Sequence, residues 1–278
     1  MLLDLGPHGV ARTGDLLAAG ATETSLRREL VAGRLRRVRK GWLATVDADA
    51  SIVEAVRRGA ALGCVSALRT HGVWVPEHDE MHLSAHPHAG RVDGAGCIVH
   101  RRRAVRSSTP VETLTEAVRQ VLRCRPTEEA IAVIDSCLHT RGMRAGAVAA
   151  LFDERPARLG HIRGEIDGSA ESGYESLVRV RLRRLGLHVS TQVQVAGVGR
   201  VDMIIGNKLV IEVDGQAWHE GPRAFLVDRG RDLALASLGM RSLRLAPRHI
   251  VHEWRWTSRA ILAAAADARR GAAIGSGG

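Results

Sequence analysis

The chain has 278 residues, 40 Lys and Arg against 30 Asp and Glu, and a formal net charge of +10 at pH 7. Apolar residues make up 45% of it, which is enough for a folded core and excludes a disordered chain. No apolar stretch approaches the roughly 20 residues of a membrane-spanning helix, and the early acid Asp4 is not expected in a secretory signal.

Arginine carries almost all of the positive charge, because Lys40 and Lys208 are the two lysines. A GC-rich genome explains this ratio, and so does phosphate binding, since the planar guanidinium makes bidentate contacts. The net charge itself favours a polyanion such as nucleic acid as partner. It divides into +5 over residues 1–110, −1 over 111–170 and +6 over 171–278. We therefore expect two basic modules on either side of a neutral region.

Residues 1–50 have the pattern of a winged helix-turn-helix. Helices are predicted over 13–18 and 23–32, with Thr22 or Thr24 as the cap of the second, and a basic hairpin over 34–43 turns at Lys40–Gly41. In such a domain the second helix enters the major groove and the wing contacts the DNA backbone. The alternative is a solvated basic face on a small helical domain. The side chains expected to bind DNA are Arg27, Arg28, Arg36, Arg37, Arg39 and Lys40.

A mixed α/β connector region is expected over residues 51–152, followed by a linker over 153–170 that is rich in Gly, Pro and charge. Strand-like alternation occurs twice in the connector, over 81–84 and 97–100. The predicted helices of this region are 52–62, 66–70, 111–122, 127–138 and 145–151.

The four cysteines are Cys64, Cys97, Cys124 and Cys137. They contain no CxxC pair and have no histidine at a usual ligand spacing. We therefore expect reduced, mostly buried thiols in a cytoplasmic protein, and no structural zinc site.

The segment 171–270 is predicted to be a second folded domain, and the tail 271–278 to be disordered. The predicted elements of the domain 171–270 are a helix over 171–186, strands over 191–195, 200–205, 208–215 and 240–245, a helix over 223–238 and a last helix from 249.

Three acids stand within the apolar strands of this domain, namely Asp202, Glu212 and Asp214. An unpaired carboxylate is costly there, and clustered carboxylates are typical ligands of Mg²⁺. A two-residue loop at 206–207 would turn Asp202 and Glu212 to opposite faces, whereas a three-residue loop places them opposite each other. The metal hypothesis therefore requires an odd loop length. The alternative is that the acids pair with arginines such as Arg200 or Arg244.

The spacing of Asp202 and Glu212 resembles the PD-(D/E)xK nuclease signature. Together with Trp218–His219 and the motifs at 200–202, 212–215, 228–232 and 238–244, the segment 171–256 is similar to a family of bacterial proteins related to very-short-patch-repair (Vsr-like) endonucleases. The N-terminal part resembles the winged-helix domain of AbiEi-type antitoxins of type IV toxin–antitoxin systems. The expected fold is thus α/β (α+β), with a winged helix-turn-helix, a helical connector and a restriction-endonuclease-like αβ domain that has a mixed central sheet.

The resemblance implies a role for each matching residue. Asp202 and Glu212 would hold Mg²⁺ or Mn²⁺, with Glu175 on the preceding helix as a supporting ligand. Asp214 stands where the signature has a lysine, which puts single-lysine catalysis in doubt. His219 would act as general base or support the leaving group, unless it is an ordinary loop histidine. Two further residues, Arg231 and Arg244, would contact phosphate or pair with the acids.

These inferences predict a metal-dependent DNA endonuclease to which the winged helix recruits DNA. For Glu175 the alternative is a helical ion pair with Arg179. The alternative for the whole chain is a non-catalytic DNA-binding regulator, an antitoxin or repressor whose nuclease domain has degenerated. RNA is disfavoured by the scarcity of aromatic stacking platforms. A homodimer stays an open alternative, and a toxin or methyltransferase partner stays unidentified.

Overall fold

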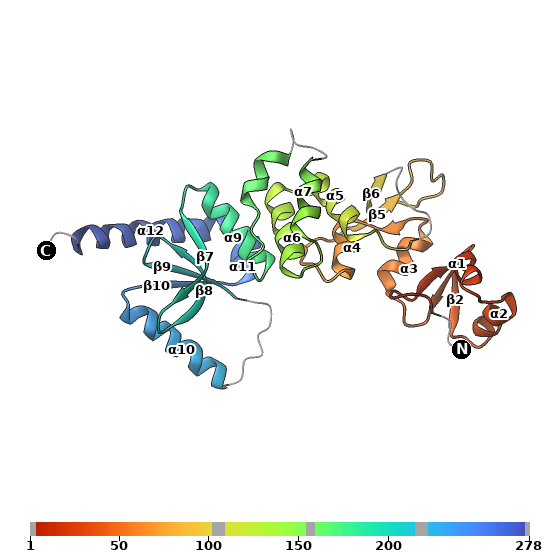
Figure 1. Cartoon of the computed structure of the whole chain (residues 1–278), viewed down its shortest axis with the longest axis horizontal. Helices are drawn as coiled ribbons and strands as arrows, with labels where there is room; N and C mark the ends of the chain where they lie inside the picture. The colour runs from red at the N-terminus through yellow and green to blue at the C-terminus, as the bar shows by residue number, and fades with distance from the viewer. Residues whose placement is uncertain (1–3, 102–108, 154–158, 215–221, 276–278) are drawn as a thin grey trace. The chain divides into compact units, whose positions relative to one another are not determined.

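The computed structural model describes residues 4–101, 109–153, 159–214 and 222–275 of the chain. It divides into two compact units, Met1–Arg125 and Pro126–Gly278 (Figure 1). Each unit combines helices with strands, and the described ranges hold one antiparallel and two mixed sheets. The prediction of a mixed α/β chain is confirmed at this level. None of the helices in these ranges combines the length and the apolar character needed to cross a bilayer.

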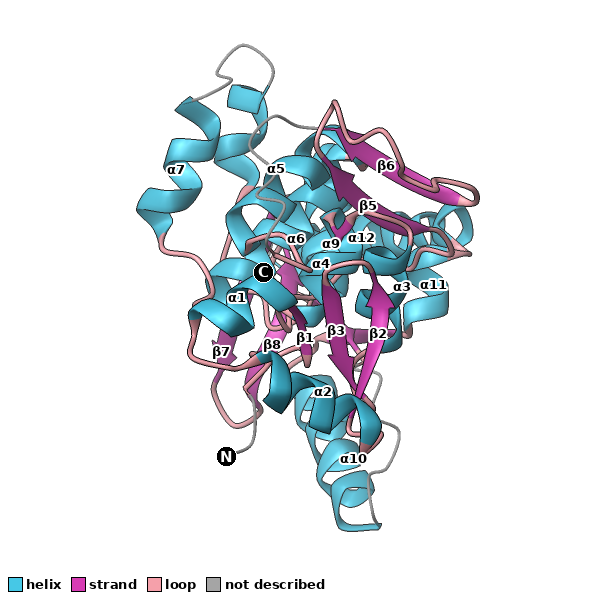
Figure 2. Ribbon diagram, turned by 90° about the vertical axis from the view of Figure 1, so that its right-hand side faces the viewer, coloured by secondary structure: helices cyan, strands magenta, loops and turns pink. Residues whose placement is uncertain are grey.

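The first unit begins with two short helices and a three-stranded antiparallel sheet of order β1-β3-β2. Thr22 caps the second helix, because its Oγ1 accepts a hydrogen bond from the Ser25 backbone at 3.1 Å and Ser25 Oγ accepts one from the Thr22 backbone at 3.0 Å. The predicted hairpin is confirmed, and Gly41 closes its turn with a φ of 79° (Figure 2). Whether this segment functions as a winged helix stays a prediction. Its elements are β1 Val10–Arg12, α1 Thr13–Ala18, α2 Glu23–Val31, β2 Leu35–Arg39 and β3 Trp42–Thr45.

The remainder of the first unit is built on a second sheet, of order β4-β5-β6, in which β5 and β6 run parallel. Asp49 caps α3 and Thr113 caps α5, each by accepting hydrogen bonds from the first turn of its helix. Helix α5 packs against α4, and both helices contribute buried apolar side chains. The elements are α3 Ala50–Arg57, β4 Ala61–Leu62, α4 Cys64–Thr70, β5 Met81–Ala85, β6 Cys97–Arg101 and α5 Leu114–Cys124.

The second unit is a four-stranded mixed sheet of order β10-β9-β8-β7 with helices around it. Leu235 of α10 packs on the sheet, and Figure 1 shows this helix on the side away from α12. The helices are α6 Thr127–His139, α7 Ala145–Asp153, the 3₁₀ helix η1 Gly160–Glu165, α9 Gly173–Arg184, α10 Pro222–Ser237, α11 Pro247–Val251 and α12 Trp254–Gly275. The strands are β7 Val189–Val195, β8 Gly199–Ile205, β9 Leu209–Val213 and β10 Arg241–Leu245.

Two segments differ from the expectation. Residues 159–170 were predicted to be a linker, but Leu159, Ile162 and Ala170 are buried in the second unit. The composition of this segment was misleading because its polar residues are used for internal hydrogen bonds rather than for solvation. The tail was expected to be disordered from residue 271, but the alanine-rich helix α12 extends to Gly275. Residues 276–278 lie outside the described ranges.

Candidate active site

The β8–β9 hairpin has the odd loop that the metal hypothesis requires. Ile205 pairs with Leu209, so the loop is the three residues 206–208, and Gly206 has a φ of 60°. The same register, continued by one pair beyond Met203 and Ile211, brings Asp202 opposite Glu212. One oxygen of Asp202, Oδ2, accepts a hydrogen bond from the backbone nitrogen of Val213 at 2.8 Å. The two strands therefore carry these two acids at one position of the sheet.

Glu175 reaches the same region from the first turn of α9. It is 7% exposed, and its Oε2 accepts hydrogen bonds from the Glu171 backbone at 3.0 Å and from Gln192 Nε2 at 2.9 Å. The alternative partner, Arg179, instead donates to Asp135 Oδ2 at 2.6 Å. The helical pair of Glu175 with Arg179 is therefore not the arrangement in the structure.

Burial and neighbouring charges raise the pKa values of both Glu175 and Asp202. Burial, and then the charge of Asp202, raises the pKa of Glu175 to about 7. The pKa of Asp202 is raised by burial and by the charge of Glu171, against the opposing hydrogen bond from the Val213 backbone and the charge of Arg231. Two neighbouring carboxyl groups that ionise reluctantly gain stability from a cation placed between them.

The arginines near these acids are engaged with carboxylates. Arg231 Nη2 donates to Glu212 Oε1 at 3.0 Å and to the Arg200 carbonyl oxygen at 2.7 Å. Arg244 lies beside Glu212 in the β9–β10 register, and its Nη2 donates to Asp232 Oδ1 at 3.2 Å. Arg231 thus pairs with one of the predicted metal ligands. Arg200 and Arg244 were the two arginines proposed as partners of the three acids. Arg200 forms an ion pair with Glu171.

One residue of this site was missed by sequence analysis. Gln192 lies in β7 opposite Asp202, at the point where the β7–β8 pairing is interrupted, and its φ is 50°. Its Oε1 is buried without a hydrogen-bond partner among the described residues. A left-handed conformation at a non-glycine residue costs roughly 1–3 kcal/mol and persists where the surroundings require it. No sequence signal pointed to Gln192, because alternation of polar and apolar residues in a strand predicts that the polar residues face solvent.

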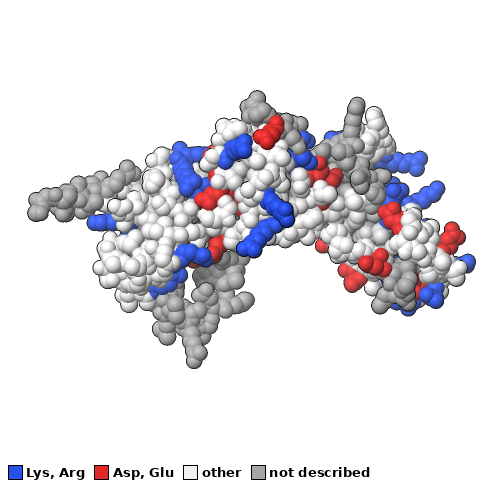
Figure 3. All heavy atoms as spheres, viewed as in Figure 1, with Lys and Arg blue, Asp and Glu red and all other residues white. Residues whose placement is uncertain are grey.

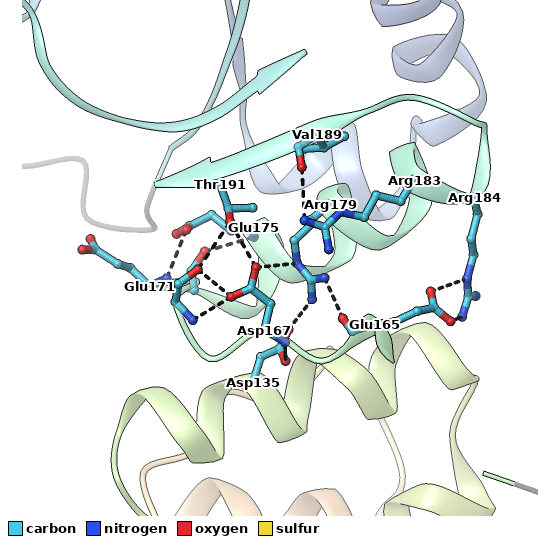
Figure 4. A network of polar contacts seen from close by, with 12 residues as sticks. Asp135, Glu165, Asp167, Glu171, Glu175, Arg179, Arg183, Arg184, Val189 and Thr191 are labelled. Carbon is cyan, nitrogen blue, oxygen red and sulfur yellow. Dashed lines mark hydrogen bonds and ion pairs between the residues drawn. The ribbon is translucent and has the colours of Figure 1, made fainter. Parts of the chain in front are cut away.

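The helix that carries Glu175 is fixed by a polar network around Arg179, which is 1% exposed (Figure 4). Arg179 Nη1 donates to the Glu165 carbonyl oxygen and Nη2 to Asp135, both at 2.6 Å. Asp135 also accepts from the Asp167 backbone at 2.8 Å, and Thr191 of β7 donates to Asp167 at 3.0 Å. The network thereby links α6, residues 165–167, α9 and β7.

The other residues predicted for the active site or for DNA binding lie at separate places in the structure or outside the described residues. Asp214 follows β9, and its backbone nitrogen donates to the Leu245 carbonyl oxygen at 3.0 Å. His219 lies outside the described residues. In the first unit, Arg39 is half-buried and the rest of the predicted DNA-contacting set is exposed. Among the described residues that Figure 3 draws in colour, acidic and basic side chains are interspersed.

A group of metal-ligating side chains is found in the described part of the first unit, namely Cys64, His82, His100 and Cys124. Their ligand atoms all lie within 4.8 Å of one another. The spacing of the cysteines and histidines in the sequence did not indicate this group, because the fold brings together residues that are far apart in the chain. The carboxylates of Asp202, Glu212 and Glu175 do not meet this criterion as a group of three among the described residues.

Comparison with known proteins adds little to this geometry. No protein-family model matches the chain, and no curated protein matches it. One solved structure with partial similarity is the catalytic domain of the homing endonuclease I-Bth0305I, which is 24% identical. The similarity covers 31% of this chain and 87% of that one, with a TM-score of 0.27. A score this low does not establish a shared fold, so function is argued from the residues.

The raised pKa of Glu175 predicts a pH-dependent stability. The folded protein holds this proton with a pKa of about 7 against an ordinary value of 4.5, so the stabilisation from protonation is complete below pH 4.5 and is lost as the pH rises through 7. The substitution Glu175→Gln removes the titrating carboxyl group, so the variant does not lose this stabilisation as the pH rises. The unfolding free energy of the variant, minus that of the wild type, should increase by about 3 kcal/mol between pH 4.5 and 8. Urea unfolding without added divalent cations measures it, and a difference that is constant with pH would contradict the assignment.

Proposed function

We propose that the second unit hydrolyses phosphodiester bonds in DNA with the help of a divalent cation. The observation that carries this proposal is the register of the β8–β9 hairpin, which, continued by one pair beyond Met203 and Ile211, sets Asp202 opposite Glu212. The carboxyl group of Glu175 is buried, which raises its pKa, and it is close enough for the charge of Asp202 to raise this pKa further. Oxygen ligands of this kind suit Mg²⁺ or Mn²⁺. The unpartnered Oε1 of Gln192 supports the fit, because it is a further buried oxygen without a donor.

The residues of the site would either bind the cation or accept a proton. Asp202 and Glu212 would hold the cation, and Glu175, which is itself held by Gln192 and the Glu171 backbone, would be a supporting ligand. When bound, such a cation polarises the phosphoryl oxygen and lowers the pKa of coordinated water. Asp214 and His219 are the candidates for accepting the proton of the attacking water.

Glu212 must first be released from Arg231. The ion pair measures 3.0 Å between Arg231 Nη2 and Glu212 Oε1, and both side chains keep some solvent exposure. A cation at Glu212 would replace the guanidinium as the partner of the carboxylate. Arg231 would then be available to a phosphate oxygen, for which its planar fork is suited.

The experiment that tests this function is cleavage by the full chain. Supercoiled plasmid and short mismatched duplexes are incubated with Mg²⁺, with Mn²⁺ or with neither. We expect cleavage only with a divalent cation. Binding without cleavage of either substrate under any of these conditions would reject the nuclease.

A second candidate function is a DNA-binding regulator without catalysis. The Glu212–Arg231 ion pair and the acid at position 214, where the nuclease signature has a lysine, favour it. In this case Arg231 substitutes permanently for the cation. The cleavage experiment separates the two candidates, since the regulator binds DNA and leaves it intact.

DNA recruitment by the first unit makes a separate prediction. Arg36 and Arg37 are exposed on β2, at the position of a wing. If each contacts a phosphate, replacing both with alanine should make the slope of log affinity against log salt less negative by about 1.8. Fluorescence anisotropy with a labelled duplex at several salt concentrations measures this slope.

The matched control for this prediction is Arg57→Ala. Arg57 is also an exposed arginine of the first unit, but it pairs with Glu54 on the same helix at 2.6 Å. This variant should leave the slope unchanged. Equal slopes for the Arg36/Arg37 double variant and the wild type would remove β2 from the DNA interface.

A further inference from the structure

Four elements of the first unit each carry one side chain with a nitrogen or sulfur metal ligand, and the four ligand atoms lie close together. Cys64 is the first residue of α4, His82 lies in β5, His100 lies in β6 and Cys124 ends α5. Their ligand atoms lie within 4.8 Å of one another, so one ion can touch all of them. This site is independent of the carboxylates of the second unit.

Two distances within the group, both measured from His82 Nδ1, are close to the edges of a tetrahedron around a single ion. His82 Nδ1 lies 3.3 Å from His100 Nε2 and 3.8 Å from Cys124 Sγ. Zinc binds imidazole nitrogen at about 2.0–2.1 Å and thiolate sulfur at about 2.3 Å, which requires about 3.3–3.4 Å between two nitrogens and about 3.5–3.6 Å between nitrogen and sulfur. The spacing also disfavours a two-iron cluster, in which the histidines and the cysteines bind separate irons.

The four ligands lie in the interior of the first unit or at its margin. His82 and Cys64 are fully buried, and His100 and Cys124 are half-buried. An ion at this point would therefore be shielded from water, as in closed structural sites.

A buried polar network holds Cys64 in place. The residue has a φ of 49°, a left-handed conformation that is unusual for a side chain with a Cβ. Its backbone nitrogen donates to Gln120 Oε1 at 2.6 Å, and Gln120 Nε2 donates to Ser84 Oγ at 2.9 Å. Ser84 in turn donates to Glu112 Oε1 at 2.6 Å. Strain of this kind, backed by a satisfied network, is typical of a position that presents a ligand.

We propose that Cys64, His82, His100 and Cys124 bind one Zn²⁺ ion in a closed, structural site of the first unit. Two sulfurs and two nitrogens are the ligand set of many structural zinc sites, and a set without an open position does not leave room for substrate. The ion would join α4 and α5 to the parallel pair β5–β6. Two thiolates would neutralise its charge. The site therefore needs no further acid.

The test is the zinc content of the full chain, purified without chelators and measured by plasma mass spectrometry. We expect about one zinc per chain in the wild type and a loss of at least about fivefold in Cys64→Ser and in Cys124→Ser, since removal of one ligand of four weakens structural binding. Cys97→Ser is the matched control, because Cys97 lies on the same strand as His100 and outside the group. It should keep the full zinc content.

A second measurement needs no variant. Cobalt alone is added to the metal-free wild-type chain, and the visible spectrum should show the intense bands of tetrahedral Co²⁺ with thiolate ligands, which Zn²⁺ then abolishes. A wild type without zinc that also lacks these bands would overturn the proposal. So would a disulfide between Cys64 and Cys124 that forms in the native protein and blocks both thiols.

Discussion

Replacing Asp202 with asparagine is expected to lower the rate of DNA cleavage by at least about 10²-fold, because loss of a metal-ligand charge removes several kcal/mol of transition-state stabilisation. DNA affinity should be unchanged. Asparagine has nearly the same shape, and its carbonyl oxygen can still accept the hydrogen bond from the Val213 backbone. The fold of the β8–β9 hairpin should therefore be kept. Single-turnover cleavage and anisotropy on the same duplex measure the two quantities.

The control for this variant is Glu253→Gln. Glu253 is also an acid of the second unit, but it pairs with Arg248 at 2.6 Å outside the site. This substitution should leave the cleavage rate at the wild-type value. If Asp202→Asn cleaves as fast as the wild type, Asp202 does not belong to the catalytic machinery, and the activity comes from elsewhere.

Asp135→Ala is expected to lower the unfolding free energy of the second unit by about 3–5 kcal/mol. Both side chains of the Asp135–Arg179 ion pair are 1% exposed, so the substitution leaves a buried guanidinium without its carboxylate. It also removes the acceptor of the Asp167 backbone nitrogen. Urea unfolding followed by circular dichroism measures the loss.

An exposed ion pair provides the comparison for Asp135. Glu54→Ala removes the partner of Arg57 and Arg58 on the surface of α3, and it should cost at most about 1 kcal/mol. In the double variant Asp135→Leu with Arg179→Met, the cost should fall below that of Asp135→Ala, because neither charge remains buried. A loss below about 1 kcal/mol for Asp135→Ala would show that the pair does not stabilise the unit.

The secondary structure of the second unit could be predicted well because its local signals agree. The segment 191–195 alternates polar and apolar residues, 200–205 is mostly apolar, and the structure has strands at Val189–Val195 and Gly199–Ile205. The sequence left a two-residue and a three-residue loop open, and the structure decides for the three residues 206–208. The placement of Asp202 and Glu212 within neighbouring strands was predicted. This part of the candidate site was accessible from the sequence.

The partner of Arg179 was not accessible in this way. The spacing of four residues favoured Glu175, but the two side chains bind different groups, and the carboxylate of Asp135 comes from a position 44 residues earlier. A pairing across two helices leaves no periodic trace in a single sequence. For the same reason residues 159–170 read as a linker, although their polar groups are used within the network around Arg179.

The Cys and His group shows the same limit for a metal site. Cys64, His82, His100 and Cys124 are separated by 18, 18 and 24 positions, whereas recognisable zinc motifs place two ligands within a few residues of each other. Here each ligand stands on a different helix or strand. The parallel pairing of β5 with β6 brings the two histidines together, and that pairing is a property of the tertiary fold.

The measurement that tests the carboxylate site most directly is a titration of the full chain with Mn²⁺, followed by electron paramagnetic resonance of the free ion. The zinc site does not compete, because thiolate and imidazole ligands disfavour Mn²⁺. We predict that the wild type and Glu253→Gln bind Mn²⁺ equally well, and that Asp202→Asn loses this binding. Identical titration curves for the wild type and Asp202→Asn would contradict the assignment of Asp202 and Glu212 as the metal site of a nuclease.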